Sequence, residues 1–257
     1  MKARILSFGR GARWLAEGWR LFRVSPPGWL ALVFVYWVAM TAVSLMPLIG
    51  IVAAMVLIPA FSVGFMAASR SCAQGKAPPL QALFDGFRNR LAAQLTLGAV
   101  YFACFALLLA ATTLADEGAL ARWMLLGSHP GDEILQSDAF LGAFAIAVGG
   151  YVPVMMLFWF APLLVAWHAM APGQALFYSF FACFLNWRAF LGYGVAAGIV
   201  TLVLPLAALS ALLLFSGGQL RTGVMVLLFP LLILLLPTLF ASFYASYRDV
   251  FGTQDEA

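Results

Sequence analysis

The chain has 257 residues, of which 64% are hydrophobic and 9% are charged, and its formal net charge is +4. An ordinary soluble domain is about 45–50% apolar and about 25% charged. This composition excludes an ordinary soluble domain, because a fold of this length could not bury so much apolar surface. We therefore expect a single integral membrane domain over residues 1–257, all-α in class.

Residues 1–28 precede the first apolar run and predict a cytoplasmic amphipathic helix on the membrane surface. At about 100° per residue, one face carries Phe8, Ala12, Leu15, Trp19 and Phe22, and the other carries Arg10, Arg13, Glu17 and Arg20. A basic face opposite aromatic residues is typical of an interfacial helix. A nucleic-acid-binding arm is the less favoured alternative, because a free arm needs no apolar stripe. A cleavable signal peptide is not expected, since the first apolar run begins only near Trp29.

Six apolar segments follow, each near the ~20 residues that a helix needs to cross the bilayer core. They are residues 29–48, 51–68, 91–114, 139–167, 189–215 and 222–244. Pro47 and Gly50 predict a tight reversal between the first two. The fourth segment is overlong, and Gly149 and Gly150 with Pro153 could bend it, begin it, or divide it into two short helices.

The basic residues indicate the orientation of these spans. With six spans, twelve of the fourteen Lys and Arg residues lie on one side, and only Arg122 and Arg221 lie on the other. Because positive charge favours the cytoplasmic side, both termini are predicted to be cytoplasmic. Residues 115–138 then form an extracytoplasmic loop.

The sequence also suggests an internal repeat of three elbow-hairpin units. Short interfacial segments, here called elbows, precede spans one, three and five at residues 17–22, 83–88 and 178–183. In each elbow a small residue precedes an aromatic one: Gly18, Gly86 and Ser179. The second span of each unit carries a proline predicted to kink it: Pro59, Pro162 and Pro237. Coincidence in a chain rich in Leu, Phe and Pro is the alternative interpretation.

Three stretches carry a resemblance: FAPLLV at residues 160–165, SFFACFLNW at 179–187 and PLQALFDGF at 79–87. They resemble motifs of an uncharacterised family of proteobacterial six-span inner-membrane proteins. That family is similar in layout to the membrane domain of some glycerophosphodiester phosphodiesterases. The resemblance implies an all-helical protein of the bacterial inner (cytoplasmic) membrane, and it transfers no functional residue, because the phosphodiesterase domain is absent.

Motifs of known chemistry are missing from the sequence. It contains no HExxH, GxSxG or Walker loop, and none of the six predicted spans carries a charged residue near its middle. An exposed polar turn explains His129, Asp132 and Glu133 better than a metal site does. We therefore predict no catalytic residue, no metal and no cofactor, and a protein that is not an enzyme.

Two kinds of contact are predicted instead. Anionic lipid headgroups on the cytoplasmic face would meet Arg10, Arg13, Arg20, Arg23, Arg88 and Arg90. Gly194 and Gly198 form a GxxxG that predicts close helix packing.

Two functions remain open on the sequence alone. The first is a non-catalytic protein that binds lipid or a membrane-protein partner, or maintains the envelope. The second is a passive or hydrophobic-substrate transporter, in which the three prolines would line a cavity.

Overall fold

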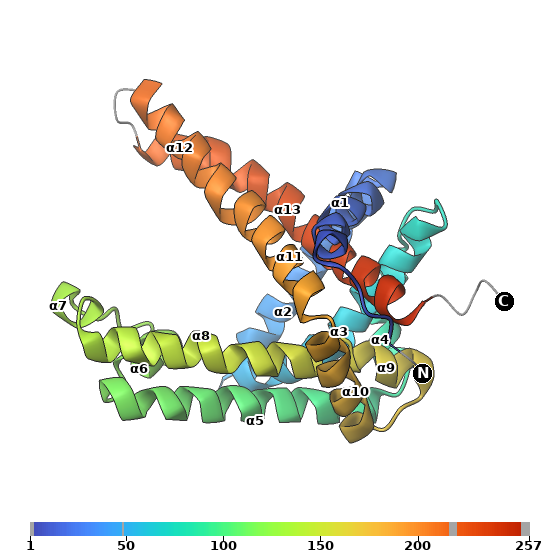
Figure 1. The fold of residues 1–257 in the computed structure, drawn as a ribbon, viewed down its shortest axis with the longest axis horizontal. Coiled ribbons are helices and arrows are strands. Elements are labelled where there is room, and N and C mark those ends of the chain that lie inside the picture. The colour runs from blue at the N-terminus through green and yellow to red at the C-terminus, as the bar shows by residue number, and fades with distance from the viewer. Residues whose placement is uncertain (1–2, 48, 216–219, 253–257) are drawn as a thin grey trace. The chain divides into compact units, whose positions relative to one another are not determined.

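The computed structural model describes residues 3–47, 49–215 and 220–252, with side chains described outside residues 212–232, and every regular element in this part is a helix (Figure 1). In chain order the helices are α1 (Phe8–Val24), α2 (Pro26–Ser44), α3 (Gly50–Ala73), η1 (Leu80–Phe84), α4 (Asp85–Arg88), α5 (Leu91–Asp116), α6 (Ala119–Leu126), α7 (Asp132–Leu135), α8 (Asp138–Phe158), α9 (Ala161–His168), α10 (Pro172–Leu185), α11 (Trp187–Gly198), η2 (Ile199–Val203), α12 (Leu204–Phe215) and α13 (Leu220–Phe251). The predicted all-α integral membrane bundle is confirmed.

Among the described residues, five helical stretches are long and apolar enough to cross a membrane: Pro26–Ser44, Gly50–Ala73, Leu91–Asp116, Asp138–His168 and Trp187–Ala211. They correspond to the first five predicted spans. The sixth, residues 222–244, lies within α13, where side chains are described only from residue 233. The predicted reversal between the first two spans is also present, because α2 ends at Ser44 and α3 begins at Gly50.

The break in the fourth span lies elsewhere than predicted. Helix α8 runs through Gly149, Gly150 and Pro153 without interruption and ends at Phe158, just before Pro162. The Phe160 amide donates to Ser179 Oγ (3.0 Å), and that hydroxyl donates to the Met156 carbonyl (2.8 Å). It thus bridges the amide and carbonyl that an uninterrupted helix would join directly, which is a known cause of helix breaks.

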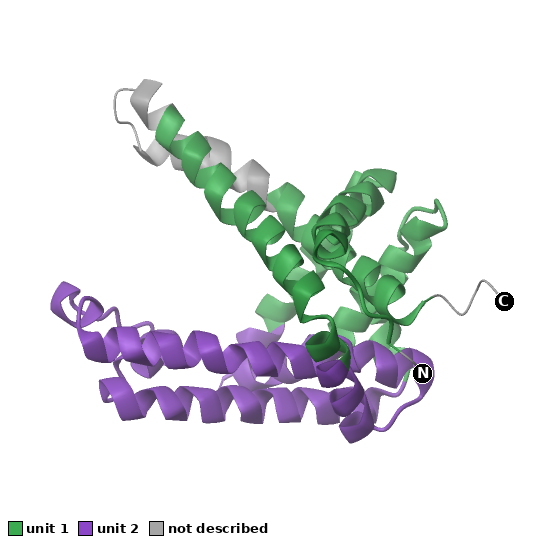
Figure 2. Ribbon diagram, viewed as in Figure 1, with its two compact units in different colours: residues 1–42, 60–89, 182–257 green, residues 43–59, 90–181 purple. Residues whose placement is uncertain are grey.

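Contacts divide the chain into two compact units (Figure 2). Unit 1 comprises Met1–Ala42, Ala60–Asn89 and Ala182–Ala257, and unit 2 comprises Val43–Pro59 and Arg90–Phe181. Helix α3 passes from one unit to the other at Pro59, one of the three prolines predicted to kink a span. The prediction that residues 1–257 form one domain stays a prediction.

In unit 1, α1 lies against both α11 and α13. Glycines allow this close approach. A Cβ at Gly11 would overlap the Ala189 carbonyl of α11, and a Cβ at Gly18 would overlap the Thr238 carbonyl of α13. On α11, a Cβ at Gly192 would overlap the Phe8 carbonyl of α1. The inner face of α1 is therefore centred on its glycines.

An aromatic cluster joins α2, α3 and α13 within the same unit. Tyr36 lies edge-on to both Phe61 and Phe65, each with 5.2 Å between ring centroids. Phe65 stacks on Phe240 with parallel rings at 4.0 Å. Phe61 also meets Phe87 of α4 edge-on at 4.9 Å, which fixes the second elbow on α3.

Each of the three small residues singled out in the elbows lies against helix backbone beside a proline. Gly86 lies against the carbonyl of Ala60, which follows Pro59. Gly18 lies in the same way against the residue that follows Pro237. Ser179 makes the bridge described above, in which its hydroxyl accepts from the amide of Phe160, two residues before Pro162. Each elbow thus packs on the proline-bearing helix of the preceding repeat, and the first elbow packs on that of the last.

In unit 2, α5 and α8 lie side by side over most of their length (Figure 1). Tyr101 and Tyr151 join them through their hydroxyls at 3.0 Å. At the start of α5, the fully buried Gln94 donates to the Pro162 carbonyl at 2.9 Å. This bond satisfies a backbone oxygen next to the break in the fourth span.

The predicted loop at residues 115–138 holds two short helices, α6 and α7. Asp116, the last residue of α5, is buried, and its carboxylate accepts from the amides of Gly118 (2.9 Å) and Leu120 (2.7 Å). These bonds satisfy free amides at the start of α6. Leu120 then packs against Phe140 of α8. The loop is therefore an ordered cap on the α5–α8 pair.

Candidate functional site: the outer face of the first helix

A set of ionic contacts in unit 1, here called the clasp, ties α1 to the end of α13. Arg10 donates from Nε and Nη2 to the two carboxylate oxygens of Asp249, the second at 2.7 Å. Trp14, fully buried, donates from Nε1 to the same carboxylate at 2.8 Å. Glu17 bridges Arg10, at 3.0 Å, and Arg248. A planar guanidinium facing a carboxylate in this fork arrangement is among the stronger ionic contacts in proteins.

The segment before α1 is held by the same end of the unit. The Arg4 amide donates to the Val250 carbonyl at 2.8 Å. The Leu6 amide donates to Asn186 Oδ1 at 2.8 Å, while Asn186 Nδ2 donates to the carbonyls of Arg4 and Ala182 at 2.9 Å. Asn186 is fully buried between α10 and α11. Backbone near both ends of the chain is therefore fixed together.

The clasp changes the electrostatic state of Arg10. Donation of a side-chain hydrogen bond to Asp249 raises the pKa of the guanidinium above its ordinary value, and partial burial acts in the opposite direction. The charges of Asp249 and Glu17 add to the rise. A pKa raised by folding stabilises the folded state at every pH below the ordinary value, so this contribution is fully present at neutral pH.

The opposite face of α1 is free of these contacts and carries exposed cations. Arg13, Arg20 and Arg23 are all exposed. At about 100° per residue, Arg13 and Arg20 lie about 20° apart on the helix. The aromatic edge of this face consists of Phe8 (47% exposed) and Trp19 (40% exposed). These two rings belong to the apolar face of the helical pattern, whereas the side of α1 that packs on α11 and α13 is taken by Gly11, Trp14 and Gly18.

The second predicted headgroup segment, η1 with α4, has a similar character. Leu80 and Phe84 are exposed apolar residues, and Arg88 is exposed beside them. Arg90, also exposed, belongs to unit 2 and precedes α5 in the left-handed conformation (φ 59°). Of the six arginines predicted to meet headgroups, Arg10 thus serves the clasp, and the other five remain on exposed surface.

The predicted packing role of the GxxxG is not found in the described part of the chain. A Cβ added at Gly194 or Gly198 would meet no described atom within 4 Å, whereas Gly192, on the same helix, lies against α1. The close contact thus belongs to the turn before the motif.

The sequence did not point to Asp249, Trp14 or Asn186 as contact residues. Gly11 and Gly18 lie seven residues apart on one helix face, and this spacing was the signal that could have revealed the packed side of α1.

Among the described residues there is no group of three or more His, Cys, Asp or Glu side chains able to hold a metal ion. His129 lies against Trp123, with 5.3 Å between ring centroids, and its Nδ1 is 2.8 Å from the Pro130 carbonyl.

Comparison with known proteins gives one informative match. A probable inner membrane protein of Burkholderia thailandensis is 40% identical over 254 residues, covering 95% of this chain and 92% of the relative. No family model matches the chain, and no solved structure matches it. None of these findings bears on the likeness in layout to the membrane domain of glycerophosphodiester phosphodiesterases, which stays a prediction.

Proposed function

Because the chain belongs to the same family as this probable inner membrane protein of Burkholderia thailandensis, we propose that it is a non-catalytic inner-membrane protein that binds anionic lipid headgroups and acts in envelope maintenance. The observation that carries the proposal is the outer face of α1, which presents Arg13, Arg20 and Arg23 beside exposed aromatic rings. The inner face of the same helix is fixed by the clasp.

The chemistry of this face fits a membrane surface. Basic side chains near an anionic bilayer contribute about 1 kcal/mol each, so three give about 3 kcal/mol, an attraction that falls off within a Debye length. Trp19 lies on one side of the cations, and its amphipathic ring favours the headgroup level, while Phe8 adds exposed apolar surface on the same side. Since α1 is already held on α11 and α13, little further ordering is needed when lipid binds.

The orientation belongs to the same proposal: both termini and α1 lie on the cytoplasmic side, and residues 115–138 lie outside. The distribution of twelve of fourteen basic residues supports it. An alkaline phosphatase fused at Gly131 should be active, and one fused at the C-terminus should be inactive. The opposite pattern would overturn the orientation.

Headgroup binding is tested with the purified full chain in nanodiscs of phosphatidylcholine, with and without phosphatidylglycerol. Phosphatidylglycerol should raise the Tm of the wild type, and added salt should reduce that gain. The variant Arg13→Gln/Arg20→Gln/Arg23→Gln should lose more than half of the gain while its Tm in phosphatidylcholine alone stays close to that of the wild type.

Arg10→Gln is the matched control, because this guanidinium serves the clasp and its side chain is only 31% exposed. Its Tm should fall by a similar amount in both lipid compositions. A triple variant that responds to phosphatidylglycerol as the wild type does would remove the proposal. Protein partners play no part in this experiment, since only purified protein and lipid are present.

A further inference from the structure

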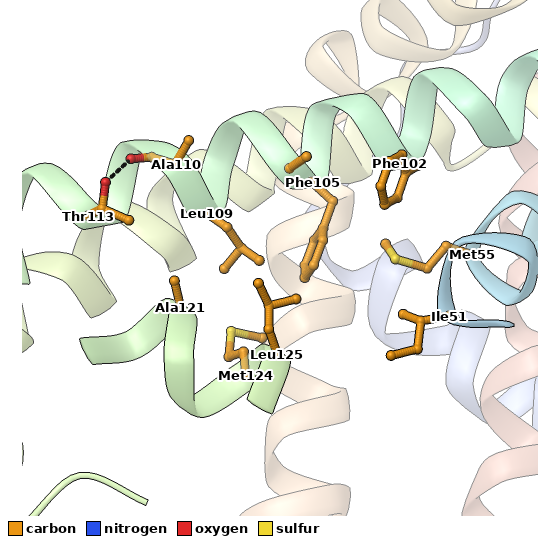
Figure 3. A pocket seen from close by; sticks show the side chains of 11 residues that line it. Ile51, Met55, Phe102, Phe105, Leu109, Ala110, Thr113, Ala121, Met124 and Leu125 are labelled. Atoms are coloured by element: carbon orange, nitrogen blue, oxygen red, sulfur yellow. Dashed lines mark hydrogen bonds between the residues drawn. The ribbon is translucent and has the colours of Figure 1, made fainter. Parts of the chain in front are cut away.

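Unit 2 contains an open apolar pocket of about 520 Å³ lined by α3, α5 and α6 (Figure 3). Helix α3 contributes Ile51 and Met55, and α6 contributes Ala121, Met124 and Leu125. The remaining wall is a continuous stripe of α5 from Phe102 to Thr113. The volume lies within the about 300–1,000 Å³ typical of small-molecule sites.

The wall of this pocket selects against polar ligands. No charged residue contributes to it, and its one hydroxyl, on Thr113, donates to the carbonyl of Ala110 within α5 at 2.7 Å (Figure 3). The thioethers of Met55 and Met124 are soft and adapt to irregular apolar shapes. A polar ligand would therefore lose its hydrogen bonds to water on entering, whereas an alkyl chain would lose none.

The length of the pocket matches one leaflet of a bilayer. Phe102 and Thr113 are eleven residues apart on α5, which at 1.5 Å per residue is about 16 Å. Half of the ~30 Å hydrocarbon core is about 15 Å. Helix α6 encloses the pocket near the end of α5, and Asp116 fixes the start of α6 through its two hydrogen bonds.

The pocket is also continuous with apolar surface that a membrane would cover. Both α3 and α5 are long and apolar enough to cross the membrane. Ile51, in the wall, is 59% exposed, and Leu107 and Leu114, on α5 next to the stripe, are 71% and 89% exposed. Lipid is the solvent of such surface, so lipid acyl chains have direct access to the pocket.

From these observations we propose that the pocket binds one acyl chain of a phospholipid, in the leaflet in which α5 ends. The site is distinct from the headgroup face of α1, which lies in unit 1. An acyl chain that enters from lipid lacks the hydrophobic gain that transfer from water would give. Retention of the chain therefore depends on the fit to the wall, and filling the pocket should abolish it.

The test uses the full chain in nanodiscs of phosphatidylcholine that carries a photoreactive diazirine in one acyl chain, followed by mass spectrometry of the labelled peptides. The neutral headgroup makes the result independent of the arginines of α1. Label should concentrate on the peptides that contain residues 102–113 and 121–125. Label spread evenly over exposed apolar helices would overturn the proposal, as would a protein–protein cross-link that covers the pocket.

Two variants sharpen the result. Ala106→Trp fills the pocket and should lower labelling at these peptides at least fivefold, and Ala121→Trp should do the same from α6. Ala103→Trp is the matched control, because Ala103 is exposed on the same helix outside the pocket wall, and its labelling should equal that of the wild type. Unchanged labelling in both pocket variants would refute the site. If neither variant folds, the labelled positions in the wild type still decide.

Discussion

Removing the carboxylate of Asp249 is the sharpest test of the clasp. The Asp249→Ala change deletes the acceptor of three hydrogen bonds, two from Arg10 and one from Trp14. It leaves a fully buried indole N–H without this acceptor and a guanidinium without its main partner. The side chain of Asp249 is only 10% exposed, so water replaces the lost contacts poorly.

The magnitude follows from these contacts. A hydrogen bond to a charged group contributes about 1.5–3 kcal/mol, but three at one carboxylate do not add independently. Arg10 is about a third exposed, so its two bonds are discounted for screening by solvent. We expect Asp249→Ala to lower the free energy of unfolding by about 2–4 kcal/mol. At about 2–4 °C per kcal/mol for a chain of this size, the Tm should fall by roughly 5–15 °C.

The assay is thermal unfolding of the detergent-solubilised full chain, followed by circular dichroism. Asp249→Asn keeps an acceptor for Trp14 and should lose about half as much. Asp132→Ala, which removes an exposed carboxylate on α7, is the control and should leave the Tm unchanged. An Asp249→Ala protein that melts with the wild type would refute the claim that the clasp holds α1.

Two further outcomes test the backbone contacts. Gly11→Ala places a Cβ on the Ala189 carbonyl and should lower the Tm. Gly9→Ala is the control, because no described atom lies within 4 Å of its Cβ, and it should leave the Tm unchanged or raise it through helix propensity. Equal effects of the two changes would argue against the close approach. Ser179→Ala removes the α10 hydroxyl that bridges the break between α8 and α9. It should lower the free energy of unfolding by about 1–3 kcal/mol and speed amide exchange at Phe160. Ser210→Ala is the control, because the described hydrogen bond of this hydroxyl lies within its own helix, to the Leu206 carbonyl. Amide exchange at Phe160 in Ser179→Ala that stays as slow as in the wild type would contradict the bridge.

Features that depend on local pattern were predictable from the sequence. The spans follow from apolar length alone, and the structure confirms membrane-capable helices at the first five. The elbows could also be located, because a small residue before an aromatic one marks a helix that lies close to another backbone. The positions of Gly18, Gly86 and Ser179 beside helix backbone near prolines support the repeat that their shared pattern suggested.

Features that depend on distant partners were not predictable. The packed face of α1 could not be read from hydrophobicity, which ranks Phe8 and Trp19 above Gly11 and Gly18, because close packing needs the absence of a side chain. The break in the fourth span was misplaced because Gly149 and Gly150 weaken a helix, but the hydroxyl of Ser179, nineteen residues beyond Phe160, interrupts it. The pocket of unit 2 is lined by residues of three helices, so no pattern within one segment of the sequence predicts it.

The clasp between the first and last helices has a consequence for how the protein is made. Arg10 leaves the ribosome 239 residues before Asp249, its partner. At about 5–20 residues per second, roughly 10–50 s pass before that partner exists. For most of that time the glycine-lined side of α1 has neither α11 nor α13 to cover it, because α11 begins only at Trp187, so the nascent helix must rest on the bilayer, on the insertion machinery or on a chaperone. Truncated chains that end before α11 would keep this side of α1 uncovered for as long as they persist.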